Sequence, residues 1–520
     1  MPRLVLRPIC GIFAEKNLAR FRLLLLAFVW SISFVRVNAQ DAYDNRVFTP
    51  AQMQQDFDQL RHTLENTHPG LYKHEDKPAM QQKMDSLRAL LNQPMSFYRF
   101  YQVIATLITD VKCEHTSCDP YGHQKFMQHL QEWKVVPLVI KFNHDKAYVV
   151  VNRTKDTSIH LGDEVCLINR QNPDSLEHAL FQYVPTEGDM ITPKEAFLST
   201  AMNFNFWYAM FISRPDSFDI VFKSPDGKIK ERVWRDSLTF KESGMNTLKN
   251  PANERVIEAD KAGQRESANP WRLKVALNKQ YAVMTLDGFG NGSIKDQKRM
   301  AEKFAGFFAE LKKDKIPNLI INLANNPGGD EANAAELFSY LISEPKHFIN
   351  DEYLITDDTV YLNHAGLPAD VLEHKDKYLY PEKDGKYYVK EETQGELPIC
   401  QPKAGRFTGK LYFYISGHTA SAASTFAAVA QSNHLGVFIG EETGGTYFGG
   451  GSSVGINMTL TNSRIKTHTS INFCDFATTG NHDPNRGVIP DYPYAPTFAE
   501  LMASNNGWEQ FVVKLMDVHN

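Results

Sequence analysis

The sequence has no dense block of basic residues. Its 520 residues include 56 Lys and Arg against 61 Asp and Glu, which gives a formal net charge of −5. A protein that follows a nucleic acid backbone needs clustered lysine and arginine to neutralise the phosphates. We therefore expect no nucleic acid partner. With 42% hydrophobic residues the chain can instead build hydrophobic cores, roughly three of them at about 150 residues per domain.

Long hydrophobic runs are also absent, apart from one near the N-terminus. Two arginines precede an apolar run over residues 23–34, and a small-residue Val-Asn-Ala site ends at Ala39. The run is too short to span a bilayer, and this order is typical of a cleaved secretory signal. The alternative is a retained membrane anchor. We expect a signal peptide over residues 1–39, no membrane span in the mature chain, and a periplasmic or secreted protein.

Cysteine is scarce. Beyond residue 39 the cysteines are Cys113, Cys118, Cys166, Cys400 and Cys474, and their spacing does not repeat as in zinc-binding modules. This odd number leaves at least one thiol outside any intramolecular disulfide. The segment from Cys113 to Cys118 could hold zinc, but a local disulfide or two buried thiols are favoured. We expect no metal and no organic cofactor.

Helical patterns fill residues 45–125. Thr49-Pro50 suits a helix N-cap and first turn, and apolar residues then recur at helical spacing until Pro69-Gly70. Two further helical patterns cover residues 79–91 and 96–111. Together these patterns predict a small helical cap.

After residue 130 the period changes to that of strands. Short β-branched runs between polar turns predict a β-rich domain over residues 130–242, with one helix in it. Its strands are expected at residues 135–140, 147–151, 161–169, 218–222 and 228–234, and its helix at 173–182. The polar residues 243–270 predict a linker.

Strand and helix patterns alternate over residues 271–500. The expected order is strand 281–286, helix 294–311, strand 319–323, helix 331–342, and later strand 410–415, helix 422–430 and strand 436–439. Such alternation predicts an α/β layer architecture.

Two strand-to-helix junctions in this region carry residues suited to chemistry. The Asn-Pro-Gly-Gly turn that ends in Gly328-Gly329 follows an apolar strand, and its backbone N–H groups could hold an oxyanion. Ser421 stands between alanines at the head of a small-residue helix, where a serine can act as a nucleophile. Taken alone, Ser421 fits an N-capping serine better.

Three motifs, in their order along the chain, carry a family resemblance. They are Thr419-Ala420-Ser421-Ala422, Gly440-Glu441-Glu442-Thr443-Gly444-Gly445 and Gly487-Val488-Ile489-Pro490-Asp491. With the upstream Asn-Pro-Gly-Gly turn, they resemble the C-terminal processing (tail-specific) serine peptidases and their tricorn-like relatives. Residues 161–169 also resemble the core strand of PDZ domains. The resemblance implies an α/β catalytic domain of the crotonase/ClpP-like kind, behind an N-terminal helical cap and a PDZ-like domain.

The resemblance also implies roles for single residues. Ser421 would be the nucleophile, and the N–H of Ala422 with that of Gly328 or Gly329 would form the oxyanion hole. Thr446 stands where the tail-specific branch has its lysine base. Threonine cannot accept a proton at neutral pH, so the Ser/Lys dyad is absent and another base is needed.

A histidine serves as that base in the tricorn-like branch. Residues 110–116 resemble its Asp-Gly-His-Thr pattern, with Glu114 in the glycine position, so His115 is the candidate base. An imidazole that titrates near ~6.5 suits this role at neutral pH, and activity should fall as the pH drops through ~6 to 7.

A third group should orient the imidazole, as the carboxylate does in serine triads. Asp483 is the candidate, because an acid precedes the Gly-Val-x-Pro-Asp motif in the tricorn-like branch. His418, His468 and His482 are rivals of His115 for the role of base.

These patterns predict a secreted serine peptidase that hydrolyses extended or unfolded polypeptides. The alternative is a catalytically inactive protein that binds a peptide or an apolar ligand on a peptidase scaffold. The absent lysine and the glutamate at position 114 are compatible with either.

Overall fold

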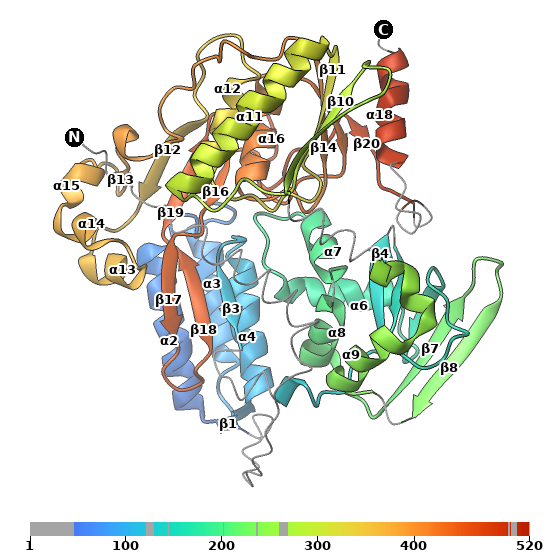
Figure 1. Ribbon diagram of the computed structural model, residues 1–520. Coiled ribbons are helices and arrows are strands. Elements are labelled where there is room, and N and C mark those ends of the chain that lie inside the picture. The colour runs from blue at the N-terminus through green and yellow to red at the C-terminus, as the bar shows by residue number, and fades with distance from the viewer. Residues whose placement is uncertain are drawn as a thin grey trace, which may run out of the picture.

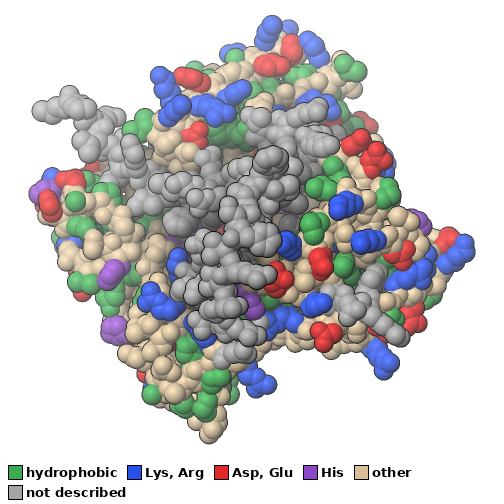
Figure 2. Space-filling model, turned by 60° about the horizontal axis from the view of Figure 1, so that its bottom comes forward, with side chains coloured by type: hydrophobic (Ala, Val, Ile, Leu, Met, Phe, Trp, Pro, Cys, Tyr) green, Lys and Arg blue, Asp and Glu red, His purple; other side chains and the backbone are tan. Residues whose placement is uncertain are grey.

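The computed structural model describes residues 46–120, 129–143, 145–200, 202–235, 238–258, 269–497, 500 and 507–518 (Figure 1). The expected signal peptide lies outside these residues. No helix in the described part combines the length and the apolar character that crossing a membrane requires. Lys and Arg are interspersed with Asp and Glu over the face in Figure 2.

Three amphipathic helices form the N-terminal part: α2 (Pro50–Thr67), α3 (Lys77–Ala89) and α4 (Phe97–Asp110). Thr49 caps α2 through a capping box with Gln52, and Pro50 occupies its first turn, as the sequence predicts. Short strands β1 (Val47–Phe48) and β2 (Met95–Ser96) pair antiparallel beside the helices. The predicted helices are confirmed to within a few residues.

A five-stranded antiparallel sheet follows, in the order β4-β5-β6-β7-β8. Its strands are β4 (Leu138–Asn143), β5 (Lys146–Asn152), β6 (Glu164–Ile168), β7 (Ser217–Lys223) and β8 (Ile229–Arg235). Helical segments in the β6–β7 connection cover it: α6 (Pro173–Leu180), η3 (Phe181–Tyr183), α7 (Thr192–Leu198), α8 (Asn203–Trp207) and η4 (Tyr208–Ile212). The expected β-rich character is confirmed.

The predicted linker over residues 243–270 is wrong for its first half. Residues 240–249 form helix α9 (Phe240–Lys249), which Thr239 and Glu242 cap reciprocally, and η5 (Pro251–Asn253) follows. The buried Asn253 side chain donates to the carbonyl of Asn152 in β5 and accepts from its N–H. These polar residues are therefore part of the β-rich domain, because their amides satisfy its backbone.

The remaining chain builds a six-stranded sheet in the order β20-β15-β14-β11-β10-β9. Its strands are β9 (Trp271–Val275), β10 (Ala282–Leu286), β11 (Asn318–Asn322), β14 (Lys410–Ile415), β15 (Val437–Gly440) and β20 (Tyr492–Pro493), all parallel except β9. Figure 1 shows α11 (Ile294–Asp314), α12 (Glu331–Ser339) and α16 (Ala422–Ser432) on one face and α18 (Gly507–Val518) on the other. The strands of this sheet carry hydrophobic side chains on both faces, because helices cover both faces of the sheet. The predicted α/β alternation is confirmed.

Two smaller sheets complete the described part, and the one that contains β3 joins the N-terminal and C-terminal halves. One has the order β13-β12-β19-β16, and the other β17-β18-β3. Their strands are β3 (Ser117–Asp119), β12 (Ile349–Leu354), β13 (Tyr387–Tyr388), β16 (Gly449–Gly451), β17 (Gly455–Thr459), β18 (Lys466–Ser470) and β19 (Asn472–Phe476). Short helices α13 (Thr359–His364), α14 (Ala369–Glu373) and α15 (Lys375–Tyr378), with η6 (Glu391–Thr393), lie in the 355–393 insertion.

Strand β3 connects the N-terminal helices to the C-terminal half of the chain. It directly follows the turn after α4 and pairs antiparallel with β18, with Cys118 opposite Thr467. The buried carboxylate of Asp56 in α2 also accepts the backbone N–H groups of Asn462 and Ser463. The helical segment is thereby held against the C-terminal half, and the turn at residues 113–116 reaches the head of α16.

Candidate active site

Ser421 occupies the junction between β14 and α16. Its φ of 50° and ψ of −132° lie outside the regions that L-residues ordinarily adopt, at a cost of about 1–3 kcal/mol. Although Ser421 is the N-cap residue of α16, its side chain makes no capping hydrogen bond. The N-cap alternative therefore fails to explain this side chain. A strained serine between a strand and a helix head presents its hydroxyl as nucleophile elbows do.

Glycine is required opposite this serine. Gly328 has a φ of +99°, and a Cβ on it would lie 2.6 Å from the Ser421 Cβ. The Asn-Pro-Gly-Gly turn can pass the serine only because position 328 lacks a side chain.

The ring of His115 lies beside the serine. Its Nε2 is 3.2 Å from the Ser421 Oγ, although 306 positions separate them in sequence. The ring belongs to a turn that Thr116 anchors: the buried Thr116 hydroxyl pairs with His68 Nε2 at 3.0 Å and accepts the Ser470 N–H at 3.3 Å. Burial lowers the pKa of His115, while the negative charge of Glu187 and the nearby Gly451 backbone oppose the shift.

The three rival histidines have other surroundings. His418 is exposed, His468 pairs through Nδ1 with the Asn457 side chain at 3.0 Å, and His482 stacks on Tyr447 with ring centroids 3.8 Å apart. Within the described ranges, His115 is the histidine that hydrogen-bonds Ser421.

Two glutamates lie beside the Ser421–His115 pair. The Glu114 Oε1 accepts the Ser421 N–H at 3.1 Å and is 3.8 Å from His115 Nδ1. Burial, with the charge of Glu187 added, raises the pKa of Glu114 to about 8. Glu114 is thus predominantly protonated at neutral pH, and position 114 keeps a neutral group against the nucleophile.

Glu187 is the charged member of this pair. Its Oε2 accepts the Glu114 N–H at 3.1 Å, and its Oε1 lies 3.9 Å from His74 Nε2. Burial acts to raise the pKa of Glu187, but contact with His74 and the charges of His74, His115 and Lys73 outweigh it, and the pKa is lowered. No motif pointed to Glu187, because it lies in an irregular loop between η3 and α7.

Asp483 is placed elsewhere. Its Oδ1 accepts the N–H of Asn485, and it is not among the residues that line the pocket around Ser421. The structure therefore does not bring it to His115, and its orienting role rests on the resemblance alone. Asn485 does pair with His74, at 2.6 Å between Oδ1 and Nδ1.

The backbone N–H groups that are expected to form the oxyanion hole differ in their positions and in their hydrogen bonds. The Ala422 N–H is in the first turn of α16, where helix amides lack intrahelical acceptors. Gly329 lines the pocket. The Gly328 N–H, however, donates to Asn326 Oδ1 at 2.9 Å, so it could serve an oxyanion only by leaving that acceptor.

Thr446, which stands where the tail-specific branch has its lysine base, makes a structural hydrogen bond. The Thr446 hydroxyl is buried and donates to the Gly449 carbonyl. Thr446 lines the pocket but offers no base, as its side-chain chemistry predicts.

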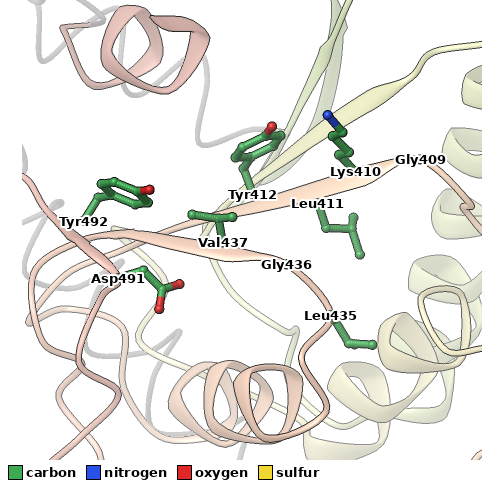
Figure 3. A pocket seen from close by; sticks show the side chains of 9 residues that line it. All are labelled: Gly409, Lys410, Leu411, Tyr412, Leu435, Gly436, Val437, Asp491 and Tyr492. Carbon is green, nitrogen blue, oxygen red and sulfur yellow. The ribbon is translucent and has the colours of Figure 1, made fainter. Parts of the chain in front are cut away.

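The pocket around Ser421 is strongly acidic in composition. Besides Glu114 and Glu187 it includes Glu331, whose Oε1 accepts the Thr425 hydroxyl at 3.0 Å. Burial raises the pKa of Glu331 to about 8. A second hollow lies along β14 and β15 and is lined by Tyr412, Asp491 and Tyr492 among others (Figure 3). It contains neither Ser421 nor His115.

All five cysteines that the structure describes are thiols, so the local disulfide is not formed. Cys118 donates to Tyr101, whereas Cys113 is buried beside the active site. The one group in the described part whose side chains could together hold a metal ion is Cys113, His115 and Glu187.

The fold is similar to that of mature CPAF, with 14% sequence identity and a TM-score of 0.56 over 90% of this chain and 96% of that chain. CPAF complexed with lactacystin gives 15% identity and a TM-score of 0.55, over 90% and 97%. The photosystem II D1 C-terminal processing protease has 12% identity and a TM-score of 0.37, over 85% and 93%, which is too distant to support a conclusion. No curated protein sequence matches the chain.

The family resemblance falls on the part of the chain that holds the serine. Residues 280–493, from just before β10 to the end of β20, match peptidase family S41. The matched segment, which holds Ser421, and the fold, which is similar to that of mature CPAF, both agree with the resemblance to serine peptidases.

Proposed function

We propose that the protein hydrolyses peptide bonds of extended or unfolded polypeptides, with Ser421 as the nucleophile and His115 as the general base. The observation that carries the proposal is the 3.2 Å separation of His115 Nε2 from Ser421 Oγ. A general base must lie within hydrogen-bond reach of the proton it removes. The strained backbone of Ser421, which leaves its hydroxyl unused in capping, supports the same role.

In the proposed reaction the Ser421 Oγ attacks a peptide carbonyl carbon while its proton passes to His115 Nε2. The Ala422 N–H, with Gly329, stabilises the negative charge on the carbonyl oxygen. His115 then gives its proton to the leaving amine, and an acyl-enzyme remains. Water, deprotonated by the same histidine, hydrolyses the ester and restores the serine.

Glu187, rather than Asp483, is proposed as the residue that supports the base. It is buried and its negative charge raises the pKa of His115, which means that it stabilises the imidazolium form. It is a positioning residue, because it acts through His115 and not on the substrate.

The proposed preference for extended substrates is inferred from β16, the edge strand of the sheet β13-β12-β19-β16. Strand β16 pairs with β19 and ends the order β13-β12-β19-β16, and Gly450 and Gly451 of β16 line the Ser421 pocket. An extended peptide could add to this edge through main-chain hydrogen bonds and bring a carbonyl to the serine. A folded protein cannot present its backbone in this way.

The domain and location predictions remain part of the proposal. Residues 45–125 would act as the helical cap, and residues 130–242, which contain the five-stranded sheet, as the PDZ-like domain of the crotonase/ClpP-like peptidase. Export as a periplasmic or secreted protein would remove residues 1–39, so the mature chain would begin at Gln40.

A pH profile of casein hydrolysis tests the proposal. A base must be neutral to accept a proton, so activity is lost on the acid side at the pKa of His115. Because burial lowers this pKa, the acid limb should be shifted to the acid side of the ordinary histidine value of ~6.5, around which the sequence alone places it. The measurement is kcat/KM against pH in the presence of EDTA.

Glu187→Gln provides the matched variant for this profile. Removing the negative charge that raises the His115 pKa should move the acid limb to lower pH and reduce kcat. A purely structural role would reduce activity without moving the limb. No hydrolysis of casein by the wild-type protein, together with peptide binding, would support the inactive binding protein instead.

A further inference from the structure

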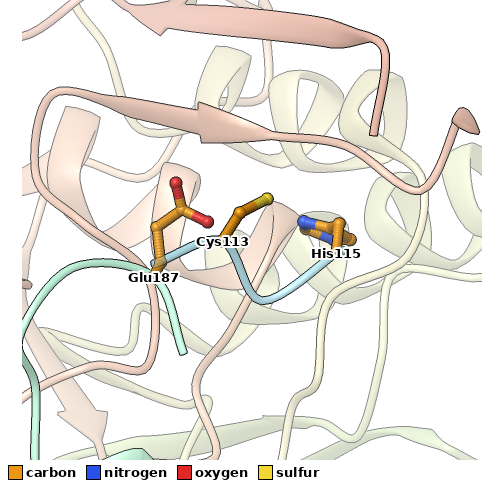
Figure 4. A group of neighbouring side chains, drawn as sticks. All are labelled: Cys113, His115 and Glu187. Carbon is orange, nitrogen blue, oxygen red and sulfur yellow. The ribbon is translucent and has the colours of Figure 1, made fainter. Parts of the chain in front are cut away.

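The turn that supplies His115 also holds a set of metal-binding side chains. One ligand atom from each of Cys113, His115 and Glu187 lies within 4.8 Å of the other two (Figure 4). In Figure 4 the Cys113 sulfur points to a ring nitrogen of His115, and the Glu187 carboxylate lies on the other side of the cysteine. Thiolate, imidazole and carboxylate are the three protein ligand types that Zn²⁺ takes, usually three of them at sites with one open position.

The two nitrogens of His115 differ in their surroundings. Nε2 faces the Ser421 hydroxyl. Nδ1 is buried and makes no hydrogen bond of normal geometry within the described residues, although Glu114 Oε1 lies 3.8 Å away and the Gly451 backbone acts on the ring. A buried ring nitrogen with no close hydrogen bond needs an explanation. A metal ion held with Cys113 and Glu187 would supply the missing partner of Nδ1.

We infer that Cys113, His115 through Nδ1, and Glu187 form a Zn²⁺ site that inhibits the enzyme. The inhibitory part of this inference rests on the proposed function, whereas the metal binding does not. Zn²⁺ would replace the proton of the Cys113 thiol, which is released to solvent, and form bonds to the sulfur, Nδ1 and a Glu187 oxygen. The fourth position of a tetrahedral zinc would take water.

Glu187 supplies a buried carboxylate to this group of side chains. The cationic partners within this cluster are Lys73 and His74, and both act on Glu187. The Cys113 thiol is buried, and a metal ion that binds its sulfur would displace its proton.

Zinc at Nδ1 would inhibit by fixing the tautomer of the base. A neutral imidazole has one N–H and one lone-pair nitrogen. When the metal takes the lone pair of Nδ1, the proton must sit on Nε2, the nitrogen that faces Ser421. Such a ring cannot accept the serine proton, so nucleophilic attack is blocked while the substrate pocket stays in place.

Binding can be tested without activity by adding Co²⁺ to the metal-free protein. A thiolate ligand gives Co²⁺ a strong charge-transfer absorption in the near ultraviolet, and Zn²⁺ should then displace it. We expect this absorption in the wild type and in Cys118→Ser, and its loss in Cys113→Ser. A wild-type Co²⁺ spectrum without a thiolate band would overturn the site even if the enzyme is active.

Inhibition is tested by titrating Zn²⁺ into the casein assay. Cys113→Ser should keep its basal activity but need on the order of 100-fold more zinc for half-inhibition, because one ligand is lost. Cys118→Ser, which alters a cysteine five positions away that contacts Tyr101, should respond like the wild type. Equal zinc sensitivity of Cys113→Ser and wild type would contradict the proposal. Zinc binding through Cys113 without casein hydrolysis would refute the proposed function and leave the metal site standing.

Discussion

Ser421→Ala is expected to abolish casein hydrolysis while the protein stays folded. The Ser421 hydroxyl makes no structural hydrogen bond to the helix that it precedes, and it faces His115. Removing the nucleophile of a serine peptidase leaves only the residual rate given by binding and the oxyanion hole, a loss on the order of 10⁶ in turnover. The measurements are kcat on casein and the thermal unfolding midpoint of the same preparation.

Ser424→Ala is the matched control, one helical turn further along α16. The Ser424 hydroxyl also lines the pocket, but it donates to the Ser421 carbonyl at 2.7 Å and does not contact His115. We expect a modest loss of activity in this variant. If Ser421→Ala were as active as the wild type, Ser421 would not be the nucleophile and the inactive binding protein would become the better account.

His115→Ala should cost about as much as Ser421→Ala, because the two residues act as one unit. In such pairs the loss of either member alone lowers turnover on the order of 10⁶-fold, and the double variant loses little more. The test is the kcat of His115→Ala, of Ser421→Ala and of the double variant. Additive losses would show that the two side chains act independently.

Three histidine variants serve as controls for His115. His418→Ala, His468→Ala and His482→Ala should retain most activity, because these rings are exposed or paired with Asn457 or Tyr447. A larger loss in any of them than in His115→Ala would transfer the role of base to that residue.

The sequence predicts those parts of the molecule that depend on local patterns. Helix α2 follows from Thr49-Pro50 and helical spacing, and the parallel strands of the large sheet follow from short apolar runs between helical ones. Ser421 and His115 were proposed from two short motifs 306 positions apart. Their contact depends on the pairing of β3 with β18, which no local pattern encodes.

The missed features depend on tertiary contacts. Glu187 lies in an irregular loop, and its importance comes from its neighbours His74, Glu114 and His115. The sequence of helix α9 predicts a linker, because the buried face of the helix carries Ser, Asn and Thr, which pack through hydrogen bonds. Asp483 matched a sequence position but lies outside the serine pocket, since spacing along a loop does not fix the direction of its side chain.

The most direct test of the account is whether a fluorophosphonate probe labels Ser421. Such a probe reacts with a serine hydroxyl only when a base activates it and an oxyanion hole receives the phosphonyl oxygen. We predict one labelled peptide that contains Ser421, with labelling lost in Ser421→Ala and strongly slowed in His115→Ala. The absence of labelling in the folded wild-type protein, or labelling that persists in Ser421→Ala, would contradict a peptidase centred on Ser421.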